Sequence, residues 1–445
     1  MPKLYETTIK ASYGNWDVYA GLRELIQNAR DGEIQYGAKM TVEHVYRVRN
    51  KKPIGAIVIT NEGITVPKEA FLTGHTTKSN RSDLIGLYGE GFKYGSLALL
   101  QQDIDIKIRN GSESWLPKIV RSKNYDAEVL AFEVHEGNKE ENRFQVEVLG
   151  IDFDKWQEYK KKFLFLNEKT YPSVDVYGGK ILLSPEHKGM LYVKGMWVCK
   201  NDKFNFGYDF DNAQIDRDRR MVDDPNTQAA NLLAKAVQKG ELVTAIYRLL
   251  SEGSEEAASF PYYLLGDEGQ EKIVKKFKEQ FGEDTLPVEG DDQIQELSHL
   301  GKQGVKVPYA LRNILVSALG STRDNIVKLR TSITKQYSTC DLTEEESNNL
   351  EVATRLVSEA LHNLGYSTDS MSRIYVVDFV DPKLGGTYNS GDCSIRMARK
   401  RLETKAKAIR LLIHEAAHVA GGDGSKAHEQ AIGDLTEFVL NKVMH

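Results

Sequence analysis

Cysteine is scarce in this sequence. The 445 residues contain three cysteines, which lie far apart in the chain at Cys199, Cys340 and Cys393. An odd number at such spacing excludes a disulfide framework and argues against a zinc site built from cysteines. A reducing compartment fits this pattern.

Long apolar runs are missing too. No stretch approaches the ~18 consecutive apolar residues that span a bilayer, and the opening residues, MPKLYETTIKASYG, lack the apolar core of a signal peptide. We therefore expect a cytoplasmic protein without a membrane segment. Repeats and tracts rich in proline and glycine are also absent, which is typical of a soluble globular protein.

Positive charge is not in excess. Lys and Arg number 59 against 64 Asp and Glu, a net charge of −5, whereas a protein that coats nucleic acid needs clustered cations. Two basic runs, RVRNKK at 47–52 and KKK at 160–162, leave nucleic-acid binding as a weakly supported alternative, because such runs are usually solvated surface.

The length indicates roughly three domains. Apolar spacing predicts a helix over 15–36, alternation predicts strands at 40–48 and 54–60, and a long helix is expected near 343–364. We expect an α+β multidomain protein. Its expected parts are residues 1–120, residues 121–250, a small α/β and helical connector at 260–340, and residues 341–445.

The segment ELIQNARD at 24–31 places polar groups on one side of the first predicted helix. Glu24, Asn28 and Asp31 follow one another at spacings of four and three residues, so they share a face. A carboxylate there could activate water as a general base, and the Asn28 oxygen could hold Mg²⁺, which prefers oxygen ligands. An ordinary polar surface helix is the alternative.

The segment GLYGEGFKYG precedes a second predicted helix. Gly86, Gly89 and Gly91 allow backbone N–H groups to approach a phosphate closely, and Lys93 adds a positive charge. A glycine motif alone is weak, but its order after the polar helix and the strand pair makes the combination specific.

Together these segments resemble the GHKL ATPase superfamily, which includes DNA gyrase, MutL, the heat-shock chaperone ATPases, sensor kinases and the MORC proteins. The glycine segment is most similar to MORC-type ATPases. The resemblance implies an α/β sandwich that binds ATP and Mg²⁺, with Glu24 as the catalytic base, Asn28 as the Mg²⁺ ligand and Asp31 on the same cofactor-binding face.

The resemblance also implies the other nucleotide contacts. Those expected around the phosphates are Gly86, Gly89, Gly91, Lys93, and Thr77 and Lys78 of TGHTTKS. ITNEGI at 59–64 would supply Asn61 and Gly63 beside the adenine base of the nucleotide. The family usually has Asp where Asn61 stands, so a charge-assisted bond to adenine is lost, and Thr65 replaces a second glycine of this segment.

Residues 121–250 suit a transducer-like α+β domain of the gyrase and MutL branch. A sensor kinase would need a phosphoacceptor histidine ahead of the ATP site, and the 23 residues before Glu24 contain none. Lys194, Arg217 and Arg219 are candidates for a contact to the γ-phosphate, and ordinary solvated basic residues are the alternative for each. By the same resemblance we expect a homodimer that depends on nucleotide.

The segment HEAAH at 414–418 has the spacing of a zinc site. His414 and His418 stand one helical turn apart and can bind one ion, with Glu415 beside it. His428 begins an apolar stripe on the next predicted helix and is the preferred third ligand. Glu429 and Asp423 remain alternatives.

The last hundred residues resemble the zincin metallopeptidases, although Gly424 occupies the position of the third histidine of metzincins. The resemblance implies that Glu415 is the general base toward a water activated by Zn²⁺. It also implies that GGTYNSGDCSIRMA at 385–398 pairs with an extended protein substrate, where Tyr388 could stabilise an oxyanion or serve only as a turn residue.

Two constellations in one chain predict an ATPase whose nucleotide state controls a zinc peptidase. The alternative is a MORC-like clamp or chaperone that binds nucleic acid or protein, with a structural or inactive zinc site. A scaffold with two inactive sites is less consistent with the sequence, because it would need neither Glu24 nor Glu415.

Overall fold

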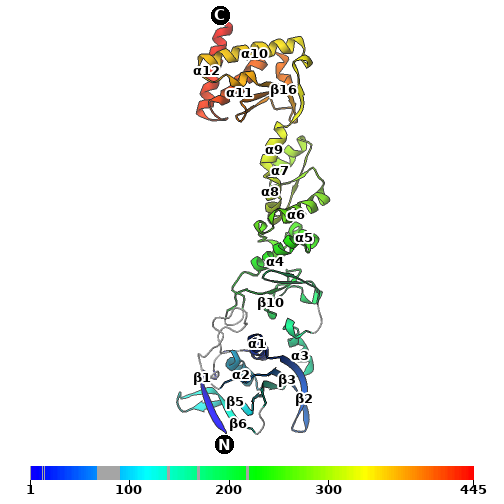
Figure 1. Cartoon of the computed structure of the whole chain (residues 1–445), viewed down its shortest axis with the longest axis vertical. Helices are drawn as coiled ribbons and strands as arrows, with labels where there is room; N and C mark the ends of the chain where they lie inside the picture. The colour runs from blue at the N-terminus through cyan, green and yellow to red at the C-terminus, as the bar shows by residue number, and fades with distance from the viewer. Residues whose placement is uncertain are drawn as a thin grey trace. The chain divides into compact units, whose positions relative to one another are not determined.

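The computed structural model describes residues 2–12, 14, 16–67, 91–137, 141–167, 171–216 and 220–444 (Figure 1). The chain divides into two compact units, Met1–Asp224 and Pro225–His445.

A seven-stranded sheet forms the base of the first unit, and every pair of neighbouring strands in it is antiparallel. Its strands, in spatial order, are β1 (Lys3–Lys10), β6 (Ala127–Glu136), β5 (Glu113–Ser122), β4 (Ile106–Asn110), β7 (Arg143–Leu149), β3 (Lys52–Glu62) and β2 (Met40–Arg49). The sheet therefore continues to Leu149. The domain boundary expected at residue 120 was too early, because it falls inside β5.

Two helices, α1 (Val18–Tyr36) and α2 (Gly91–Gln101), pack against this sheet. The Asp17 side chain accepts a hydrogen bond from the Ala20 N–H at the start of α1, and Gly37 ends that helix in a left-handed conformation with φ 68°. This confirms the helix that apolar spacing predicts over 15–36.

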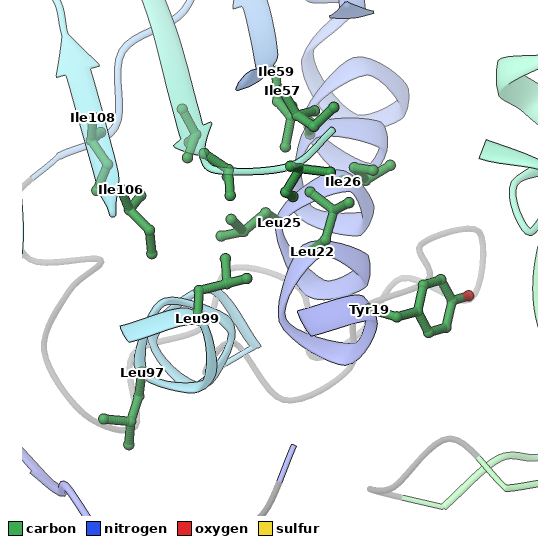
Figure 2. Close-up of a cluster of buried hydrophobic side chains, with 14 of the residues drawn as sticks. Tyr19, Leu22, Leu25, Ile26, Ile57, Ile59, Leu97, Leu99, Ile106 and Ile108 are labelled. Carbon is green, nitrogen blue, oxygen red and sulfur yellow. The ribbon is translucent and has the colours of Figure 1, made fainter. Parts of the chain in front are cut away.

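Apolar side chains of α1 and α2 meet over the sheet. Figure 2 shows Leu99 of α2 directed toward Leu22 and Leu25 of α1. The same cluster includes Ile26, Ile57, Ile59, Leu97, Ile106 and Ile108. Burying each such side chain contributes about 1.5–3 kcal/mol, so this packing fixes α1, which carries ELIQNARD, over the sheet.

A second, five-stranded sheet completes the first unit. Its order is β11 (Met196–Lys200), β10 (Met190–Val193), β12 (Gly207–Phe210), β9 (Gly179–Leu182) and β8 (Ser173–Val176). Helix α3 (Phe153–Lys160) lies between the two sheets in the chain. Phe163, and Met196 of β11, join the hydrophobic core of α1 and the first sheet. Leu182 and Tyr192 of the second sheet form a separate cluster with Leu164.

The first part of the second unit is mainly helical. Its helices are α4 (Pro225–Lys239), α5 (Val243–Glu252), α6 (Gly266–Phe281), α7 (Asp291–His299), α8 (Tyr309–Leu319) and α9 (Thr322–Thr331). A parallel pair of strands, β13 (Thr285–Val288) and β14 (Gln303–Lys306), lies among them, with α7 as the crossover.

A four-stranded sheet with three helices forms the last part. The strand order is β15 (Ile333–Tyr337), β16 (Ile374–Phe379), β18 (Ser394–Ala398) and β17 (Gly386–Asn389), which leaves β17 at one edge. The helices are α10 (Glu344–Asn363), α11 (Lys405–Ala416) and α12 (Lys426–Met444). Their apolar faces share one core with the sheet.

The chain is therefore a mixed α/β protein with several sheets, as the sequence predicted at the level of fold class. Among the residues with described structure, no helix is both long and apolar enough to cross a membrane.

Candidate nucleotide and metal sites

The polar face of α1 is buried beside the first residue of α2. Glu24 and Asp31 are almost fully buried, and a Cβ atom added to Gly91 would collide with Glu24 Oε2 and lie 3.5 Å from Asn28 Nδ2. Gly91, which lies in the described part of the glycine segment, is therefore next to Glu24 and Asn28 of ELIQNARD. The Asn28 Nδ2 group donates to the Glu24 carbonyl at 2.6 Å, so Oδ1 is the amide atom suited to a cation.

Two cations accompany this face. Arg23 lies 3.4 Å from Glu24 Oε1, and Lys93 of α2 is buried. Four residues expected at the phosphates, Thr77, Lys78, Gly86 and Gly89, lie outside the described residues.

The structure gives Asn61 a further role. Its buried Nδ2 group donates to the Ala29 carbonyl at 2.8 Å and to the Ala38 carbonyl at 3.4 Å, which ties β3 to α1. Both partners are acceptors, so the orientation of the amide is fixed and an aspartate could not replace it. A carboxylate at this position could not donate the two hydrogen bonds that Asn61 donates here. Gly63 follows in a turn with φ 86°.

Lys194 lies near a different face of α1. It occupies the turn between β10 and β11 with φ 52° and lines a cavity of about 490 Å³ together with Arg30 and Ile34 of α1. Those two positions are offset around the helix from Glu24 and Asn28. Arg217 and Arg219, the other candidates for a γ-phosphate contact, lie outside the described residues.

Three histidines converge where α11 leads into α12. His414 is in α11, His418 is in the short 3₁₀ helix η9 (Ala417–Val419), and His428 is in the first turn of α12. A turn with Gly424 at φ 75° reverses the chain between them. Ligand atoms of the three histidines and of Asp423 all lie within 4.8 Å of one another.

This donor set fits a zinc ion. Imidazole and carboxylate are both zinc ligands, and four of them suffice for tetrahedral coordination. The expected third ligand, His428, is in the cluster, and so is Asp423, which the sequence left as an alternative; Glu429 is not in it. Backbone carbonyls hold two of the rings: His418 Nδ1 is 3.2 Å from Gly421 O, and His428 Nε2 is 3.3 Å from His414 O.

Glu415 points into the interior beside these rings. Its Oε2 atom is 3.9 Å from His418 Nε2, and Oε1 would be 3.0 Å from a Cβ atom on Gly386 of β17. Burial, and to a lesser extent the negative charge of Asp423, raise the pKa of Glu415 to about 7. A carboxyl group with such a pKa can exchange a proton near neutral pH.

The edge strand β17 borders the same site. The Tyr388 ring stacks on His418 with ring centres 5.7 Å apart. Sequence reasoning missed Arg401, whose Nε atom is buried without a hydrogen-bond partner and would be 2.8 Å from a Cβ atom on Gly385. The adjacent glycines, Gly385 and Gly386, were the available signal, because paired glycines in a strand mark a close approach of other groups.

The chain matches no protein-family model and no curated protein sequence.

Proposed function

We propose that this protein is a GHKL-type ATPase whose nucleotide state controls a C-terminal HExxH zinc peptidase acting on protein substrates. The observation that carries the proposal is the convergence of His414, His418 and His428 beside the buried Glu415. Three histidines and an adjacent buried carboxylate are the groups that metal-assisted hydrolysis requires.

The residues of the second unit can divide the work of peptide hydrolysis. When bound, Zn²⁺ would polarise the scissile carbonyl and lower the pKa of water. Glu415 would take a proton from that water and pass it to the leaving amine, because its buried carboxylate lies beside the histidine cluster. As the edge strand of its sheet, β17 offers backbone groups that can pair with an extended peptide.

The ATPase part of the proposal is supported by the buried polar face of α1. Glu24 is held against Gly91 and beside Arg23, where a carboxylate can orient a water toward a phosphate. Asn28 supplies an oxygen for Mg²⁺. The proposed partners are a protein substrate and, when ATP is bound, a second copy of the chain.

The test is a mass-spectrometric search for new protein N-termini in a cell extract. Wild type and Glu415→Gln are compared, each with and without ATP and Mg²⁺. Because glutamine keeps the size of the side chain but cannot accept the proton, we expect new termini with wild type alone, in amounts that change with ATP.

One observation favours a second candidate, an ATP-operated clamp or chaperone. Asp423 brings the number of protein donors in the cluster to four, and four protein ligands are typical of a structural zinc site. Identical termini from wild type and Glu415→Gln would contradict a peptidase and favour the clamp.

A further inference from the structure

Asp423 lies at the centre of the histidine cluster. Its Oδ1 atom is 3.5 Å from His414 Nε2, 3.5 Å from His418 Nε2 and 3.9 Å from His428 Nδ1. One carboxylate oxygen thus faces a nitrogen atom of all three rings, which is the placement of a ligand that shares an ion with them.

Asp423 is held less firmly than the histidines. His428 is 98% buried and lies within reach of a backbone carbonyl, whereas 73% of the Asp423 side chain is exposed. Within the described part of the chain, its ion pairs are with the three rings alone. The flanking residues Gly422 and Gly424 have open space around them. Because the Asp423 side chain is exposed, rotation about its own bonds can withdraw the carboxylate without moving α11 or α12.

We propose that Asp423 is a displaceable fourth metal ligand that closes the zinc site until a competing ligand takes its place. The inference rests on the proposed zinc site and adds its regulation. When Asp423 is bound, the four protein donors would fill the tetrahedral positions around the metal. When Asp423 is withdrawn, the three histidines would leave one coordination position open for water or a substrate carbonyl.

Removing Asp423 should affect two affinities in opposite directions. The loss of a ligand lowers the affinity of the protein for the metal. It also removes the group that any other ligand must displace from the fourth position on the metal. The apparent affinity of such a ligand therefore rises by the inverse of the fraction of molecules in which that position is open. A residue with a merely structural role would weaken both kinds of binding.

The experiment measures both affinities on the full chain. Zn²⁺ affinity is measured by competition with a chelating indicator, and the affinity of the zinc-loaded protein for acetohydroxamate is measured by calorimetry. For Asp423→Ala we expect Zn²⁺ affinity to fall about 10- to 100-fold, the scale of losses around metal sites. Acetohydroxamate affinity is expected to rise about tenfold, as it would if Asp423 were bound in about 90% of molecules.

The matched control is Asp434→Ala, which removes the same charge from the exposed side of α12 and should change neither affinity. Unchanged affinities in Asp423→Ala, or a fall in both with the thermal unfolding temperature intact, would overturn the inference. So would a wild type that binds no Zn²⁺. Neither measurement depends on proteolysis. If Zn²⁺ affinity falls and acetohydroxamate affinity rises in a protein that cleaves no substrate, the peptidase proposal is refuted and the proposed role of Asp423 stands.

Discussion

At the scale of single residues, Asp209 in β12 is a buried carboxyl whose charge is costly. It accepts a hydrogen bond from the Gly195 N–H at 2.7 Å, yet burial raises its pKa from 3.8 to about 6. Between these two pH values the unfolded chain loses the proton that the folded chain keeps. Stability therefore falls as the pH rises from about 4 to about 6, and the loss persists above 6.

Asp209→Asn keeps an acceptor for Gly195 and removes the charge. We expect it to raise the free energy of unfolding by on the order of 2 kcal/mol at pH 7.5 and by little at pH 4. All four tryptophans of the chain lie before residue 200, so denaturation followed by tryptophan fluorescence reports on the first unit. Asp202→Asn, at an exposed position, is the control. An equal gain at both pH values would show that burial of charge is not the cause.

Residue type and spacing predicted the histidine cluster but not every role in the two sites. His414 and His418 are four residues apart, a spacing that places two side chains on one face of a helix, so sequence alone indicated the pair. The donor role of Asn61 depends on carbonyl groups at Ala29 and Ala38, which approach it only after β3 packs against α1. Arg401 was missed for the same reason, because its neighbour Gly385 comes from a different element.

At the scale of elements, α1 and α2 cross at two glycines. A Cβ atom on Gly95 would lie 2.8 Å from the Gly21 carbonyl oxygen and 3.1 Å from Glu24 Cβ. Gly95→Ala should push α2 away from the polar face of α1. We expect a loss of about 1–3 kcal/mol in unfolding free energy, typical of overpacking, together with weaker ATP binding.

The control for this crossing is Gly433→Ala in α12, where a Cβ atom would meet open space. Alanine there should stabilise its helix by about 0.5–1 kcal/mol. Denaturation curves and equilibrium ATP binding of the two variants check both signs. Wild-type stability and ATP affinity in Gly95→Ala would mean that the crossing is looser than described and does not position Glu24.

Elements with regular patterns were predictable, and elements that depend on their partners were not. Apolar spacing identified α1, and alternation identified the strands now seen as β2 and β3. β5 was missed, because its sequence ESWLPKIVRS contains a proline and several charges; it becomes a strand by pairing along β6, with Pro117 opposite Phe132. The order of the strands in the sheet could not be predicted either, because neighbouring strands are often distant in sequence.

At the scale of the whole molecule, the two candidate catalytic glutamates belong to different compact units. Glu24 lies in Met1–Asp224 and Glu415 in Pro225–His445. Any control of peptide hydrolysis by ATP must therefore cross the boundary between the units. Coupling between distant sites typically amounts to a 5- to 150-fold effect, so ATP is expected to change the rate of cleavage by about that factor.

Glu24→Ala tests this coupling, because it removes the proposed base for ATP hydrolysis and leaves the second unit unaltered. We expect ATP turnover to fall about 10²- to 10⁴-fold, the usual contribution of a general base. The response of Glu415-dependent cleavage to ATP should change with it, since the chain can no longer pass through the hydrolysed state.

Phosphate release and quantified new N-termini measure the two effects, with Glu43→Ala, an exposed position on β2, as the control. Cleavage that is unaltered in Glu24→Ala, with or without ATP, would mean that the two units share a chain but not a mechanism, because a nucleotide site that controlled Glu415 could not lose its catalytic base without effect.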